Sequence, residues 1–256
     1  MKLSRRQALA SLVTASAGQI PLAAIGFADT APPSAANGPD GVCVLWPQMV
    51  EGPYYFDPKL VRQDIAEGRP GTPVKLVLKI VEFGSCKPLA NVRIDVWHAD
   101  ADGIYSGYNG QGDHRDTSTK GQSYLRGTQM AGLDGSVMFS TIFPGWYPGR
   151  TPHIHIKAML DDKTIVTGQA FFPDAFSERI YRGATPYSTR PVPDTTNATD
   201  GIYQNGEKDG GGIVLALAEE GSVIVAALTI AVDRIGGAAR KSQSWGDRLR
   251  EVFGRR

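Results

Sequence analysis

Two histidines separated by one residue, His153 and His155, follow a turn rich in proline and glycine. Side chains at alternate positions of a β-strand point to the same face, so both imidazoles can reach one metal ion. The pair alone is weak evidence, because His-x-His also occurs in copper and zinc sites. However, the chain has only four histidines, and Tyr147 and Arg150 stand in the turn that leads into this pair. The spacing therefore indicates a metal site built on a strand and the turn before it.

Short runs of alternating apolar residues predict the strands that position this site. In the clearest run, residues 74–83, apolar side chains occupy one face and lysines the other. Predicted strands cover residues 74–83, 92–97, 136–142, 153–160, 164–172, 213–218 and 222–232. Seven short strands separated by turn residues are typical of a β-sandwich. The long connections 103–123 and 173–211 lack alternation, and loops of this length are often functional.

Composition and charge restrict the classes of function. The 27 Lys and Arg residues nearly balance the 26 Asp and Glu residues, so no global charge favours nucleic acid or an anionic membrane as a partner. The 30 glycines and 17 prolines suit many short strands and turns. A chain of 256 residues, 41% of them apolar, is compatible with one main domain.

The N-terminal residues 4–9, SRRQAL, resemble a twin-arginine export signal. Gln19 and Pro21 make the following segment too polar for a stable membrane anchor. We expect a signal peptide over residues 1–28 and a linker over 29–41. The main domain is expected over 42–236 and a tail with a short helix over 237–256. The expected location is the periplasm or the exterior of a bacterial cell.

The chain has two cysteines, Cys43 and Cys86. An exported protein enters an oxidising compartment, where the two thiols can pair, so a structural disulfide is the favoured interpretation. A metal site that combines these cysteines with histidines is the alternative, although nothing in the spacing favours it.

Four motifs together resemble the intradiol ring-cleavage dioxygenases, the family of protocatechuate 3,4-dioxygenase and catechol 1,2-dioxygenase. They are EGPYY at 51–55, DVWHADADGIY at 95–105, PGWYPGRTPHIH at 144–155 and QAFF at 169–172. Their order and spacing match together, which is far more specific than the His-x-His pair. The resemblance implies an all-β fold, a prealbumin-like β-sandwich with long active-site loops and little helix.

The resemblance also implies a set of ligands for non-haem Fe(III), namely Tyr105, Tyr147, His153 and His155. Two phenolates and two neutral imidazoles suit ferric iron, and a highly charged cation can deprotonate tyrosine at neutral pH. Tyr147 is implied to leave the metal when substrate binds. By the same resemblance Arg150 stabilises negative charge on the substrate, and Gln169 supports the site from the next strand.

The implied function is Fe(III)-dependent intradiol cleavage of a catechol-type aromatic by O2, with both oxygen atoms entering a muconate-type product. The expected partners are a catechol and O2, and no nucleic acid. Which catechol is used, and whether the chain forms a homo-oligomer, stay open. Two other functions also stay open: a secreted β-sandwich binding module without catalysis, and a different metalloenzyme that uses the His-x-His pair. The two tyrosines argue against copper or zinc at that pair.

Overall fold

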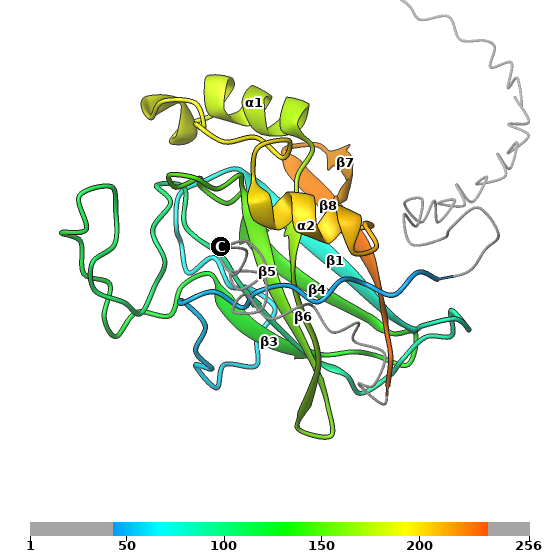
Figure 1. The fold of residues 1–256 in the computed structure, drawn as a ribbon. Coiled ribbons are helices and arrows are strands. Elements are labelled where there is room, and N and C mark those ends of the chain that lie inside the picture. Colours follow the sequence, from blue (N-terminus) through cyan, green and yellow to red (C-terminus); the bar gives the residue numbers. More distant parts are fainter. Residues whose placement is uncertain (1–42, 235–256) are drawn as a thin grey trace, which may run out of the picture. The chain divides into compact units, whose positions relative to one another are not determined.

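Two four-stranded sheets form the sandwich in the computed structural model, which describes residues 43–234 (Figure 1). In the first sheet the strand order is β4 (Ser136–Ile142), β1 (Pro73–Glu82), β8 (Val223–Val232) and β7 (Ala216–Glu220). In the second sheet it is β3 (Arg126–Met130), β2 (Arg93–Trp97), β5 (His153–Leu160) and β6 (Lys163–Phe171). Only β1 and β8 pair in parallel; the other pairs named here are antiparallel.

Alternation along the strands builds the core between the two sheets. Leu76 and Leu78 of β1 and Ile154 and Ile156 of β5 are fully buried in one hydrophobic cluster. Burial of such side chains contributes roughly 1.5–3 kcal/mol each to folding. The residues of β5 that alternate with Ile154 and Ile156 therefore face the opposite side of the second sheet.

The expected all-β sandwich with little helix is confirmed. All seven predicted strands are present within a few residues of their expected bounds. The strand β3 was not predicted, because its sequence RGTQM is polar and does not alternate. No helix within residues 43–234 is both long enough and apolar enough to span a membrane. The predicted signal peptide, linker and C-terminal tail lie outside the described residues.

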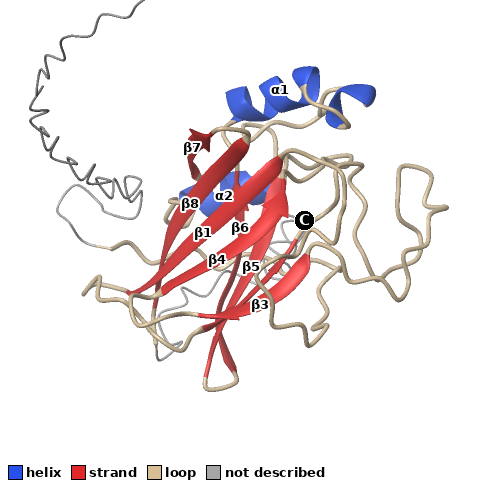
Figure 2. Ribbon diagram, turned by 180° about the vertical axis from the view of Figure 1, so that it is seen from behind, coloured by secondary structure: helices blue, strands red, loops and turns tan. Residues whose placement is uncertain are grey.

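The interpretation of residues 173–211 as a loop was wrong. This stretch contains α1 (Asp174–Gly183), the 3-10 turn η1 (Tyr187–Thr189) and α2 (Gly201–Lys208), and Figure 2 shows α1 beyond the ends of the strands. Asp200 caps α2, because its side chain accepts hydrogen bonds from the backbone amides of Ile202 and Tyr203. Both helices are too short and too polar for their periodicity to stand out in the sequence.

The expected disulfide is present between Cys43 and Cys86. It ties the segment that enters the domain to the turn after β1, across 43 residues of sequence. A loop of this length predicts a stabilisation of about 2–4 kcal/mol.

His98, directly after β2, is buried and satisfied by neutral hydrogen bonds. Its Nδ1 donates to the Ala99 carbonyl at 2.8 Å, and its Nε2 accepts from the Thr141 hydroxyl at 2.7 Å. Burial lowers the pKa of His98 to about 4. His98 is therefore neutral at pH 7 and belongs to the fold.

This buried histidine predicts a loss of stability in acid. In the unfolded chain a histidine takes up a proton near pH 6.5, whereas folded His98 does so only near pH 4. The stability that neutral His98 contributes is therefore complete above pH 6.5 and is lost as the pH falls toward 4. Between pH 6.5 and 4 the free energy of unfolding of the wild type should fall about 3 kcal/mol more than that of His98→Gln. Urea denaturation at each pH measures this difference. The His114→Gln variant, at an exposed position, should follow the wild type; parallel curves for wild type and His98→Gln would contradict the assignment.

Candidate metal centre

The pairing register of the second sheet places the predicted metal site. Trp97 on β2 lies opposite His155 on β5, and His155 lies opposite Gln169 on β6. Residues that pair directly across strands point to the same face, so these three side chains form a row. The row lies on the face turned away from the core side chains Ile154 and Ile156.

The two histidines converge at their Nε2 atoms, which lie 3.2 Å apart. His153 Nδ1 donates to the Thr151 carbonyl at 2.7 Å, and this bond leaves the lone pair on Nε2 free to bind a ligand. His155 is held differently: its ring stacks on Trp97 with centroids 4.8 Å apart and planes at 10°. Its buried Nδ1 has no hydrogen-bond partner among residues 43–234. Stacking therefore fixes the orientation of this second imidazole.

The two tyrosines bring their hydroxyl oxygens to the same point. The Tyr105 oxygen lies 3.1 Å from His155 Nε2 and 3.3 Å from His153 Nε2. The Tyr147 oxygen lies 3.2 Å from His153 Nε2. All four residues predicted as ligands are thus brought together in one cluster.

Close backbone packing holds the two tyrosine segments against each other. Gly103, just before Tyr105, has φ of 78°, and a Cβ on it would lie 2.1 Å from the Trp146 carbonyl oxygen. A Cβ on Gly145 would lie 2.2 Å from the Asp100 carbonyl oxygen, which accepts a hydrogen bond from the Gly145 amide at 2.8 Å. Only glycine permits this approach, so the tyrosines from two distant segments share one position.

Arg190, in the segment after η1, fastens the same two segments from outside. Its Nη1 donates to the Trp146 carbonyl at 3.0 Å and to the Ala101 carbonyl at 3.4 Å. The guanidinium carbon also lies 4.7 Å from the centroid of the Trp146 ring. The Arg190 guanidinium therefore stabilises the packing of the Tyr105 loop against the Tyr147 turn.

Arg150 and Gln169, which were predicted to support the site, lie next to the cluster. Arg150 Nη1 lies 3.3 Å from the Tyr147 oxygen, and Nη2 donates to Gln169 Oε1. Gln169 Nε2 in turn donates to the Val50 carbonyl at 3.1 Å. A fixed positive charge is thus held beside the oxygen of Tyr147.

Asp200 is the functional candidate that the sequence analysis missed. Its fully buried carboxylate accepts from Arg150 Nε at 2.8 Å and from the Thr151 amide at 3.1 Å, besides capping α2. Since the Thr151 carbonyl holds His153, Asp200 supports both the arginine and one imidazole. The capping pattern of an aspartate before a helix was the available signal, but the segment was interpreted as a loop.

Burial keeps all four side chains of the cluster uncharged without a cation. Burial, with the neighbouring Arg150, lowers the pKa values of His153 and His155 well below the usual range. Burial raises the pKa of Tyr105 well above its usual value and that of Tyr147 above 10. Both phenols are therefore protonated at pH 7 until a strongly charged ion favours their anions.

The donor atoms fit a metal ion. Ligand atoms about 2.0–2.1 Å from one ion in tetrahedral geometry lie about 3.3 Å from one another, and the separations here are 3.1–3.3 Å. Two nitrogens and two hard oxygens suit a hard or borderline cation such as iron. Within residues 43–234 no three His, Cys, Asp or Glu side chains cluster as a metal site, so a metal ion at this cluster would need the tyrosine oxygens as ligands beside the two imidazoles.

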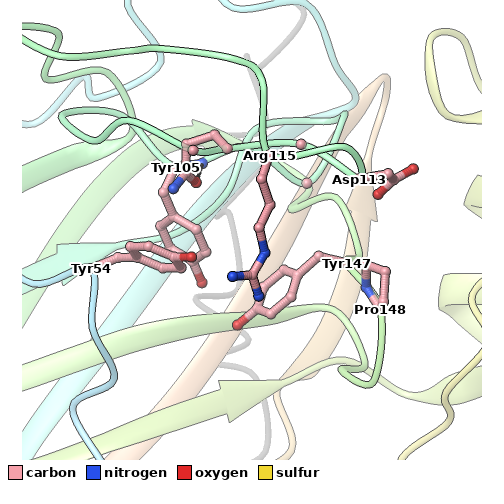
Figure 3. Close-up of a pocket in the computed structure, with 10 residues that line it drawn as sticks. Tyr54, Tyr105, Asp113, Arg115, Tyr147 and Pro148 are labelled. Carbon is pink, nitrogen blue, oxygen red and sulfur yellow. Dashed lines mark hydrogen bonds between the residues drawn. The ribbon is translucent and has the colours of Figure 1, made fainter.

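A cavity of about 260 Å³ opens beside the two tyrosines (Figure 3). Tyr54 forms one wall and stacks on Tyr105 with centroids 4.7 Å apart. The connection 103–123 supplies much of the remaining lining, including Gln111, Asp113 and Arg115. The cavity is slightly smaller than the usual range of about 300–1,000 Å³ for ligand pockets, which suits a one-ring molecule.

Comparison with known proteins agrees with this geometry. A family model described as dioxygenase matches residues 47–174. A solved intradiol ring-cleavage dioxygenase from Tetranychus urticae is 32% identical, with a TM-score of 0.66 over 75% of this chain and 95% of that one. The dioxygenase domain of a carbohydrate-binding fusion protein from Streptomyces sp. SirexAA-E is 27% identical, with a TM-score of 0.52 over 74% of this chain and 98% of that one.

Among curated proteins, chlorocatechol 1,2-dioxygenase from Cupriavidus pinatubonensis is 28% identical over 147 residues. These residues cover 48% of this chain and 53% of that protein. The chain therefore spans about half the length of the curated relatives that it matches.

Because Arg150 and Asp200 form a buried ion pair, we expect substitutions at the two positions to have strongly non-additive effects on stability. Asp200→Asn keeps a good helix cap but leaves the Arg150 charge without its partner, so the free energy of unfolding should fall by about 3 kcal/mol. Adding Arg150→Gln removes the unpaired charge and should restore part of this loss. Urea denaturation measures Asp200→Asn, Arg150→Gln alone and the double variant. Glu178→Gln, in an exposed pair, should change stability by less than about 1 kcal/mol, and simple additivity in the double variant would refute the coupling.

Proposed function

The chain belongs to the intradiol ring-cleavage dioxygenases, and from this premise we propose that it cleaves a catechol-type aromatic with O2 by means of a non-haem Fe(III). The observation that carries the proposal is the convergence of four donor atoms, from Tyr105, Tyr147, His153 and His155, at 3.1–3.3 Å. The family match disfavours a non-catalytic binding module. The two phenol oxygens disfavour a copper or zinc enzyme built on the histidines alone.

When bound, Fe(III) supplies Lewis acidity that draws electron density from a chelated catecholate and makes its ring reactive toward O2. Tyr105, Tyr147, His153 and His155 are the residues that would hold it. Their neutral imidazoles and anionic phenolates balance most of the ferric charge, which favours the ferric state. The buried position of Tyr105, which is 1% exposed, excludes water from one side of the centre.

Tyr147 is suited to a second task as a base. It is less buried than Tyr105, lines the cavity and is carried by the turn that precedes β5. Its phenolate oxygen can accept a proton from a catechol hydroxyl that takes its place. The Arg150 guanidinium, 3.3 Å from that oxygen, stabilises negative charge on the substrate side of the site.

We also infer that the protein works outside the cytoplasm. The twin-arginine motif over residues 4–9 supports export. The disulfide between Cys43 and Cys86 supports an oxidising compartment, because such bonds are rare in the cytosol.

Product analysis tests the proposed reaction. Iron-loaded protein given catechol and ¹⁸O2 should consume one O2 per catechol and form a muconate that carries both labelled atoms. Tyr147→Phe removes the proposed base and ligand, so kcat/KM should fall by about 100-fold or more. An oxygen electrode and mass spectrometry provide the two measurements.

Tyr203→Phe is the matched control, since it removes a tyrosine hydroxyl on α2 away from the cluster and should retain wild-type turnover. A ring-opened semialdehyde, the product of extradiol cleavage, would contradict the intradiol reaction. Equal rates for Tyr147→Phe and the wild type would contradict the role of Tyr147.

A further inference from the structure

Arg115 enters the cavity beside the metal centre from the connection 103–123. Figure 3 shows its side chain running down between Tyr54 and Tyr147, and in this view the guanidinium overlaps the Tyr147 ring. The residue is exposed to the cavity and solvent. Among the described residues, its guanidinium has no hydrogen-bond or ion-pair partner. An unpartnered cation therefore faces the space that a substrate would occupy.

The backbone around Arg115 is anchored, so this placement is built into the loop. Gln111 and Thr117 exchange two backbone hydrogen bonds, of 2.9 and 3.1 Å, and the Arg115 amide donates to the Gly112 carbonyl at 3.0 Å. These bonds close a tight hairpin, residues 111–117, with Arg115 near its tip.

The base of this hairpin is tied to a residue of the metal centre. Gln111 Oε1 accepts from the Tyr105 amide at 3.1 Å, and Thr119 Oγ1 donates to the Tyr105 carbonyl at 2.7 Å. The loop that positions Tyr105 thus also fixes where Arg115 enters the cavity.

The other charges around the cavity already have partners. Asp113 lines the cavity, but its carboxylate points away from Arg115 in Figure 3 and lies 3.8 Å from Arg190 Nη2. Arg150 is paired with the buried Asp200. Arg115 is therefore the cavity charge that a substrate can neutralise.

We propose that Arg115 binds a carboxylate carried on the ring of the catechol and so selects carboxylated catechols over neutral ones. Arg115 lines the same cavity as Tyr105 and Tyr147, so a carboxylate on the ring of a catechol bound at the tyrosine oxygens would share that space with its guanidinium. A guanidinium recognises a carboxylate by two parallel hydrogen bonds. The inference rests on the proposed function and adds the substrate class to it.

A matched pair of substrates tests the inference. In 3,4-dihydroxybenzoate and 4-methylcatechol, a carboxylate and a methyl group occupy the same ring position. The iron-loaded wild type should have the higher kcat/KM for the carboxylate. Arg115→Gln should lower that value by about 10- to 100-fold, mainly through KM, because a hydrogen bond to a charged group is lost. It should change 4-methylcatechol by less than about 2-fold.

Two further variants serve as controls. Arg115→Lys keeps the charge without the two-pronged geometry and should fall between the wild type and Arg115→Gln. Lys120→Gln, at an exposed position of the same connection, should leave both substrates unchanged.

The assignment is overturned if the wild type prefers 4-methylcatechol, if it cleaves catechol but refuses the carboxylate, or if Arg115→Gln affects both substrates equally. The first two outcomes leave the proposed function standing. Failure to cleave any catechol would instead overturn the proposed function and this inference with it.

Discussion

The alternation of side chains along β5 is the constraint on which the site depends. It sends Ile154 and Ile156 into the core and turns His153 and His155 to the opposite face. The core therefore fixes the histidines, because β5 could shift its register only by moving its apolar side chains out of the core. Everything else in the site, from the tyrosine segments to the buried Asp200, is arranged around this immobile pair.

Charge balance is the second condition. Burial holds the imidazoles and phenols neutral, so removal of the phenol protons would require the free energy of binding a cation. Asp200 neutralises Arg150 at 0% exposure of its carboxylate, which lets a guanidinium stand beside Tyr147 inside the protein. Arg115, on the solvent side, has no such partner within residues 43–234. Arg150 is thus a paired charge inside the protein, whereas Arg115 is the charge that we propose binds the substrate.

The sequence predicted the parts of the site that depend on local periodicity. His153 and His155 follow from alternation, and Tyr147 from its place in the adjoining turn. Tyr105 is 48 residues from His153, and its approach depends on contacts of Gly103 and Gly145 that no local pattern reveals, so only the family resemblance indicated it. Asp200, 50 residues from Arg150, was missed because short polar helices leave little periodicity. The strand β3 was missed for the same lack of alternation.

The visible absorption spectrum of the iron-loaded protein tests the central claim most directly, namely that two tyrosinates bind ferric iron. Charge transfer from phenolate to Fe(III) absorbs visible light strongly, so a protein with one iron per chain should be reddish. Tyr147→Phe should shift and weaken the band, whereas Tyr203→Phe should leave it unchanged. A colourless protein that contains a full complement of ferric iron would contradict the account.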